Sequence, residues 1–134
     1  MEAVLSNHGE ALSSRAFVSQ VRASIVDENI ATYRMLLEPT SLETASDPYW
    51  RSLLALHGRL SEEDRDIVYA VMRQVAVDTV SNMFAVIDGS ARMQGQSEDV
   101  ELVGAKSRSV LEPLVAGFVS RARRAQSGDA VGVR

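Results

Sequence analysis

Residues 61–89, SEEDRDIVYAVMRQVAVDTVSNMFAVIDG, decide the fold of this chain. Ser61 is a favoured residue for the start of a helix, and the acidic residues that follow it suit the positive end of a helix dipole. The apolar pattern then continues without a break to Ile87, and Gly89 is a natural stop. The sequence therefore predicts one long helix over about 62–88.

The apolar face of this helix is wide. Five large side chains lie within about 40° of Ala76 on a helical wheel: Tyr69, Met72, Val80, Met83 and Ile87. With its flanks the apolar arc covers roughly 200°, whereas the stripe of a surface helix covers about 100°. We therefore expect an all-α fold, an irregular bundle of four to five helices around this long central helix.

The opposite side of the same helix carries a polar stripe made of Gln74, Asp78, Ser81 and Asn82. These residues are three or four positions apart, so neighbours in the stripe can share hydrogen bonds. The stripe has three interpretations: a solvent-facing edge, a buried polar network that fixes helix register, or a site where another molecule docks. Asp78 distinguishes them, because a carboxylate sealed among apolar groups costs several kcal/mol unless it is paired or protonated.

Two helices are predicted before the long one. The apolar positions of residues 14–38 change face at 27–29, which predicts a long helix with a kink or a short break, ended by Pro39. Asp47 followed by Pro48 predicts the start of the next helix, which Gly58 ends. His57 lies on its apolar face, so we expect a packed, hydrogen-bonded histidine rather than a catalytic one.

After the long helix, residues 90–108 lose helical periodicity. Alternating apolar residues predict a small β-hairpin within about 91–103, pairing 91–94 with 99–103. Ser109 and Glu112 form a capping box that predicts the start of the last helix. Residues 126–134 carry no periodic signal, so we expect a single helical domain over 1–125 and a flexible C-terminal tail over 126–134.

The composition excludes several kinds of site. The chain has no cysteine, and its two histidines, His8 and His57, have no second metal ligand at helical spacing. It has no glycine-rich phosphate loop and no nucleophile elbow, so we expect no metal and no cofactor. The absence of a long apolar run and of a signal sequence predicts a cytoplasmic protein without membrane contact. A net charge of −4 argues against nucleic-acid binding.

An acidic, cysteine-free domain without a catalytic cluster suits a non-enzymatic protein–protein interaction domain. We expect a binder or neutraliser of another protein, of the immunity-protein or adaptor type, and a homodimer is equally compatible. The polar stripe (Gln74, Asp78, Ser81 and Asn82) is the expected contact. Glu62, Glu63 and Asp66 would steer a basic partner by long-range attraction.

The alternative is a small-molecule-binding protein or an enzyme with a pocket between helices, anchored by Asp78. His57 or Tyr69 would then be the polar partner of Asp78, and Met72 and Met83 would form an adaptable wall. A closed pocket that converges on Asp78 would favour this alternative, whereas a convex acidic surface would favour protein binding.

Overall fold

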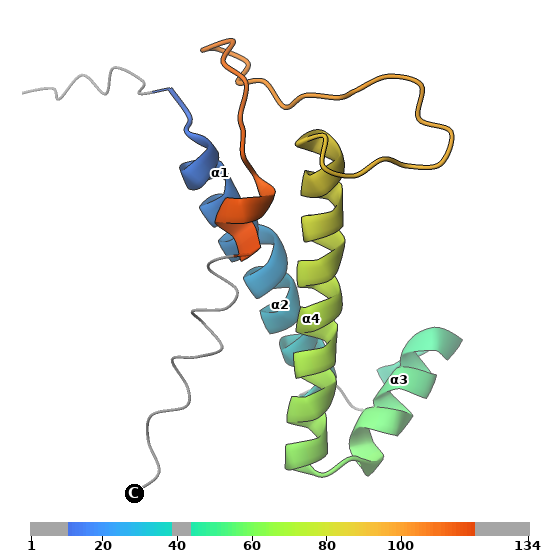
Figure 1. Cartoon of the computed structure of the whole chain (residues 1–134). Coiled ribbons are helices and arrows are strands. Elements are labelled where there is room, and N and C mark those ends of the chain that lie inside the picture. Colours follow the sequence, from blue (N-terminus) through green and yellow to red (C-terminus); the bar gives the residue numbers. More distant parts are fainter. Residues whose placement is uncertain (1–10, 39–43, 120–134) are drawn as a thin grey trace, which may run out of the picture. The chain divides into compact units, whose positions relative to one another are not determined.

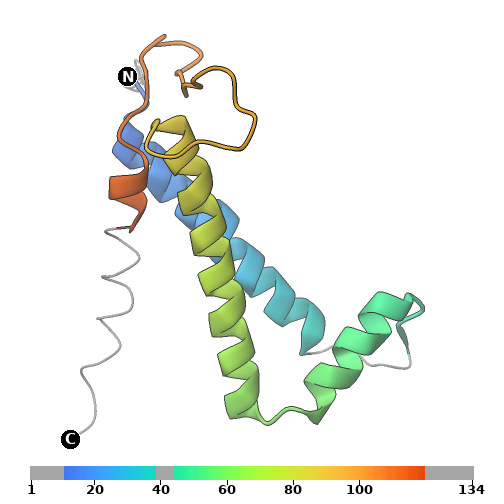
Figure 2. The same cartoon turned by 45° about the vertical axis from the view of Figure 1, so that its right-hand side comes forward.

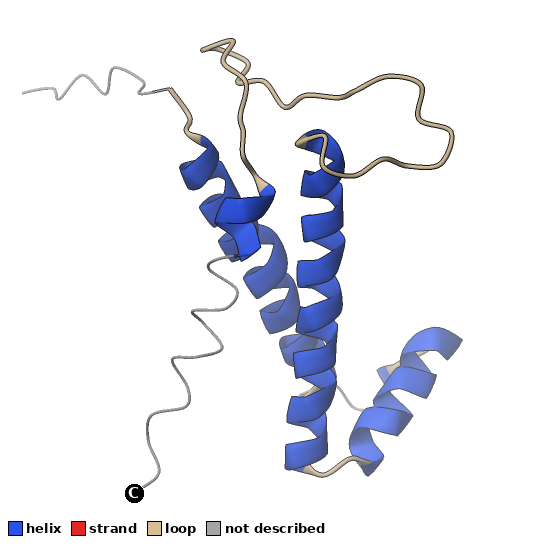
Figure 3. Cartoon of the chain, in the orientation of Figure 1, coloured by secondary structure: helices blue, strands red, loops and turns tan. Residues whose placement is uncertain are grey.

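The computed structural model describes residues 11–38 and 44–119 of the chain. They form α1 (Ser14–Val21), the π-helical turn η1 (Arg22–Asp27), α2 (Glu28–Leu37), α3 (Pro48–Arg59) and α4 (Glu62–Ile87) (Figure 1). Figure 3 shows these helices joined by loops, with no strand among the described residues. The predicted all-α class is therefore confirmed.

The predicted helix ends are formed by the expected residues. The Asp47 carboxylate accepts hydrogen bonds from the backbone N–H groups of Tyr49 (2.9 Å) and Trp50 (3.2 Å) at the start of α3. The Ser61 hydroxyl accepts from the third residue of α4 at 3.1 Å. Gly89 follows α4 with φ of +76°, a backbone conformation that glycine adopts without strain. The long helix is thus confirmed over nearly its whole predicted range.

The predicted kink or break within residues 14–38 takes the form of η1, which ends where the apolar positions change face. The backbone N–H of Glu28 donates to the carbonyl of Ala23, five residues earlier, as a π-helical turn requires. Such a turn holds an extra residue and therefore rotates the side chains that follow it. Glu28 is consequently exposed, while Val26 is fully buried.

Contacts divide the chain into two compact units, each with its own core. The central unit is Gln20–Val80, and the terminal unit combines Met1–Ser19 with Ser81–Arg134. In the central unit, the C-terminal end of α3 lies near the first turns of α4, and the two helices diverge from there (Figures 1 and 2). Its core contains Leu37, Leu54 and Tyr69, one from each of α2, α3 and α4. A single bundle and a single domain over 1–125 stay predictions.

The core of the terminal unit is built on aromatic contacts. The Phe84 ring lies 5.4 Å from the Phe118 ring and 6.1 Å from the Phe17 ring, measured between centroids. Val18 and Leu114 are fully buried in the same unit. These contacts hold the helical residues 115–119 in place.

The start of the last helix differs from the prediction. Residues 109–114 are not helical, and helical geometry begins at Val115. The Asp88 carboxylate accepts from the backbone N–H groups of Leu114 (2.8 Å) and Val115 (2.8 Å), so it supplies the cap that Ser109 was expected to give. The backbone carbonyl of Ser109 instead accepts a hydrogen bond from the N–H of Gly104 at 2.9 Å.

The predicted hairpin is also wrong in detail. No strands form within 91–103, and an isolated antiparallel bridge joins Val103 to Val110. The Gln96 side chain accepts from the backbone N–H of Met93 (3.0 Å) and donates to the carbonyl of Glu98 (2.8 Å). Such side-chain bonds to the backbone compete with a strand ladder and favour turns.

The apolar arc of α4 is covered only in part. Tyr69 is buried, and Met72, Val80 and Ile87 are half-buried, but Met83 is 62% exposed. The wide apolar arc predicted for α4 is therefore not covered at Met83.

Candidate functional site

The central unit contains an apolar groove of about 510 Å³ bounded by α2, α3 and α4. Most of its lining is aliphatic, and the polar groups come from Asn29, Tyr33, Tyr49 and His57. Among the residues that the structure describes, no charged side chain lines it. A volume and lining of this kind are typical of a binding site.

The walls of this groove expose large apolar side chains to solvent. Val71 and Val75 on α4 are 58% and 60% exposed, and Tyr49 and Leu56 on α3 are 65% and 44% exposed. Apolar side chains scattered singly over a surface need no explanation, whereas a group of them around a concavity marks an interaction site.

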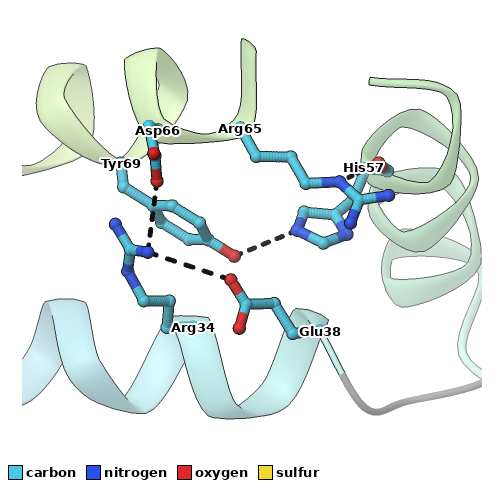
Figure 4. A network of polar contacts seen from close by, with 6 residues as sticks. All are labelled: Arg34, Glu38, His57, Arg65, Asp66 and Tyr69. Carbon is cyan, nitrogen blue, oxygen red and sulfur yellow. Dashed lines mark hydrogen bonds and ion pairs between the residues drawn. The ribbon is translucent and has the colours of Figure 1, made fainter. Parts of the chain in front are cut away.

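A buried hydrogen bond joins two of the helices that bound the groove. The Nε2 atom of His57 on α3 lies 3.0 Å from the hydroxyl oxygen of Tyr69 on α4 (Figure 4). The Tyr69 ring is also contacted by the Arg34 guanidinium, 4.2 Å from the ring centroid, and Arg34 in turn pairs with Asp66 at 3.2 Å. Tyr69 therefore connects all three helices that bound the groove.

The surroundings of this pair keep both rings uncharged at neutral pH. Burial lowers the pKa of His57, and the positive charge of Arg65 adds to this effect, while Glu38 opposes it. Burial raises the pKa of Tyr69, and Glu38 adds to the increase. A neutral imidazole beside a protonated phenol makes a stable hydrogen bond. The prediction of a packed, hydrogen-bonded histidine is therefore confirmed.

The predicted stripe residues lie outside the groove. Gln74 and Asp78 are exposed on α4, and Nε2 of Gln74 donates to Oδ1 of Asp78 at 2.8 Å. In the terminal unit, Ser81 is half-buried and Asn82 is exposed. The Asp78 carboxylate is not sealed among apolar groups, so the buried-network interpretation does not apply to it. The solvent-edge and docking interpretations stay open.

The expected steering charges lie at the start of α4. Glu62 and Glu63 are exposed in its first turn. Asp66 is exposed as well, but its ion pair with Arg34 offsets its charge within the chain.

The sequence analysis did not identify the α4 residues that form the wall of the groove. Val71 and Val75 lie at four-residue spacing and continue a row that begins at Ile67, which does not itself line the groove. This spacing is the signal of a second apolar row along α4. Two residues of the alternative hypothesis, His57 and Met72, do line the groove, whereas Asp78 and Met83 do not.

Metal-ligand groups and membrane-spanning helices were sought within the part of the chain that the structure describes. There, no three histidine or acidic side chains gather in a group that could hold a metal ion. None of the described helices has both the length and the apolar content that crossing a membrane requires. The chain matches none of the family models, curated proteins and solved structures with which it was compared.

Proposed function

We propose that this chain is a non-enzymatic protein-binding domain, of the neutraliser or adaptor type, whose groove receives an apolar segment of another protein. The observation that carries the proposal is the set of large apolar side chains exposed along the two walls of the groove: Tyr49, Leu56, Val71 and Val75. A binding partner would remove these side chains from water.

The exposed apolar surface would contribute part of the free energy of an interaction. Full burial of a large apolar side chain contributes about 1.5–3 kcal/mol, and these four are each about half-exposed. Their coverage would contribute roughly 3–6 kcal/mol before the entropy of association is subtracted. Because association itself costs several kcal/mol, further contacts of the partner around the groove would have to supply the rest of the affinity.

The openness of the walls favours a protein over a small molecule. Ligand sites typically bury about 70–90% of the ligand surface, which needs walls that close around it. The volume of about 510 Å³ does favour a small-molecule-binding protein as the second candidate. Asp78, the carboxylate expected to anchor that ligand, does not line the groove.

Two matched variants on α4 test the proposal. Val71 and Ile67 lie one helical turn apart and are 58% and 59% exposed, but only Val71 lines the groove. We expect a partner captured from the native host with the wild-type chain to be retained by Ile67→Ser and lost by Val71→Ser. With the purified partner, Val71→Ser should raise Kd by about tenfold, which corresponds to about 1.4 kcal/mol.

Equal effects of the two substitutions would refute the groove as the binding site. Retention of a small molecule by the purified chain in native mass spectrometry, reduced by Val71→Ser alone, would favour the second candidate instead.

A further inference from the structure

The negative charge of the chain is concentrated in the unit that contains the groove. Gln20–Val80 has ten of the 18 acidic residues and six of the 14 basic residues. The remainder of the chain has equal numbers of the two kinds, so the whole net charge of −4 belongs to the central unit.

Acidic side chains flank the apolar lining on two helices. Glu28 precedes the lining residue Asn29 on α2. On α4, Asp64 lies one turn before Val68, and Asp78 lies three residues after Val75. All three acidic residues are exposed, and none has an ion pair among the described residues.

Nearby basic groups already have partners within the chain. Arg73 pairs with Asp27, and Arg34 pairs with Asp66. The Arg65 side chain donates to the backbone carbonyl of His57 at 2.9 Å. Arg59 at the end of α3 is exposed and lies between the lining residues His57 and Leu60 in the sequence. Because the His57 carbonyl carries no charge, Arg65 keeps its positive charge, as Arg59 does. The three exposed acidic residues outnumber these two, so the rim has a net negative charge and attracts a positively charged partner.

The chemistry of the lining also restricts the backbone conformation of the occupant. An extended peptide would place its N–H and C=O groups against mostly aliphatic walls and leave many of them without partners. A helix satisfies its own backbone and presents only side chains, and its ridges fit between neighbouring helices.

From the charges and the lining together, we propose that the groove binds a cationic amphipathic helix of another protein, with Lys or Arg residues flanking its apolar stripe. This inference rests on the proposed function and specifies the partner. A second copy of this chain is disfavoured as the occupant, because it would bring its own Glu28, Asp64 and Asp78 toward the same acidic rim.

Two synthetic 18-residue peptides test this inference on the full-length chain. Both have leucine at helical spacing, and the remaining positions are lysine in one peptide and glutamate in the other. By fluorescence anisotropy at low salt, the lysine peptide should have a Kd at least about tenfold below that of the glutamate peptide. The difference should shrink as salt is raised, because the rim charges are exposed.

Variants of the chain separate the contribution of charge from that of the groove. Asp64→Asn combined with Asp78→Asn should weaken the lysine peptide by about three- to tenfold. Val71→Ser should weaken it as well, while the matched variant Ile67→Ser should leave its Kd unchanged.

Each contrary outcome has a distinct meaning. Equal binding of the two peptides, still lost with Val71→Ser, would overturn the cationic partner and keep the groove as a protein-binding site. Binding that ignores Val71→Ser would overturn this inference, because the peptide would then bind outside the groove. Binding of neither peptide would overturn this inference alone, because the host partner tests the proposed function separately. Dimerisation of the chain that Val71→Ser abolishes would identify a second copy as the occupant and overturn it too.

Discussion

Lowering the pH below neutrality should destabilise the central unit through His57. This histidine is 7% exposed, and burial together with Arg65 lowers its pKa, so it stays neutral in the folded chain. In the unfolded chain its pKa returns to the ordinary value of about 6.5. As pH falls, the unfolded state therefore takes up this proton first, and folding becomes less favourable.

The sign and size of the effect follow from this single proton. The stability that neutral His57 contributes is fully present above about pH 6.5 and is lost as pH falls toward the lowered pKa of the folded state. Between pH 7.5 and 5.5 the loss from this residue is at most about 1.4 kcal/mol, the limit reached when folded His57 does not protonate in that range.

Urea unfolding at the two pH values measures this loss. Fluorescence of Trp50, the one tryptophan of the chain, reports on the central unit because Trp50 packs against its core. The His57→Gln variant is the control, since glutamine can bond the Tyr69 hydroxyl but does not titrate. Other titrating groups act equally in both proteins. If the variant loses as much free energy of unfolding as the wild type, His57 is not the cause.

Three further predictions concern single polar contacts. Tyr69→Phe removes the hydroxyl that lies 3.0 Å from the buried Nε2 atom of His57, and it should lower the free energy of unfolding in urea by about 1–3 kcal/mol. A loss below about 0.5 kcal/mol would show that this hydrogen bond does not stabilise the fold. Asp88→Ala should cost about 1–3 kcal/mol and speed hydrogen exchange at the two amides it caps, whereas unchanged exchange there would exclude the cap. Asp47→Ala should lower the stability measured by thermal unfolding by about 0.5–2 kcal/mol, and Asp47→Ser should retain most of the wild-type stability. Equal Tm values for the wild type and both variants would show that Asp47 does not stabilise the helix as a cap.

Local signals in the sequence predicted the helices well. Asp47 before Pro48, Ser61 at the start of α4 and Gly89 after its end act through neighbours in the chain, so reading adjacent residues is sufficient to find them. The change of apolar face near residues 27–29 similarly located the end of η1. These features depend on short-range bonds, which is why sequence patterns contain them.

Features that depend on distant residues were not predictable in the same way. Asp88 caps an amide 26 positions later, and no sequence rule for helix starts refers to so distant a residue. The groove likewise needs three helices together. On a helical wheel Val71 lies on the same side of α4 as the polar stripe, and only the presence of α3 near that helix makes it a wall residue. Asp78 has a carboxylate that could anchor a ligand, but it does not line the groove.

The long-range bond from Asp88 makes the intervening segment a loop anchored at both ends. The entropic cost of closing a flexible loop rises by only about 0.6 kcal/mol when its length doubles, so residues inserted in this segment should lower the stability of the fold very little. Gly95, exposed and with φ of +82°, stands within it and is not a groove residue. A fluorophore or an affinity tag inserted there would give a labelled chain in which the helices that line the groove keep their own sequence.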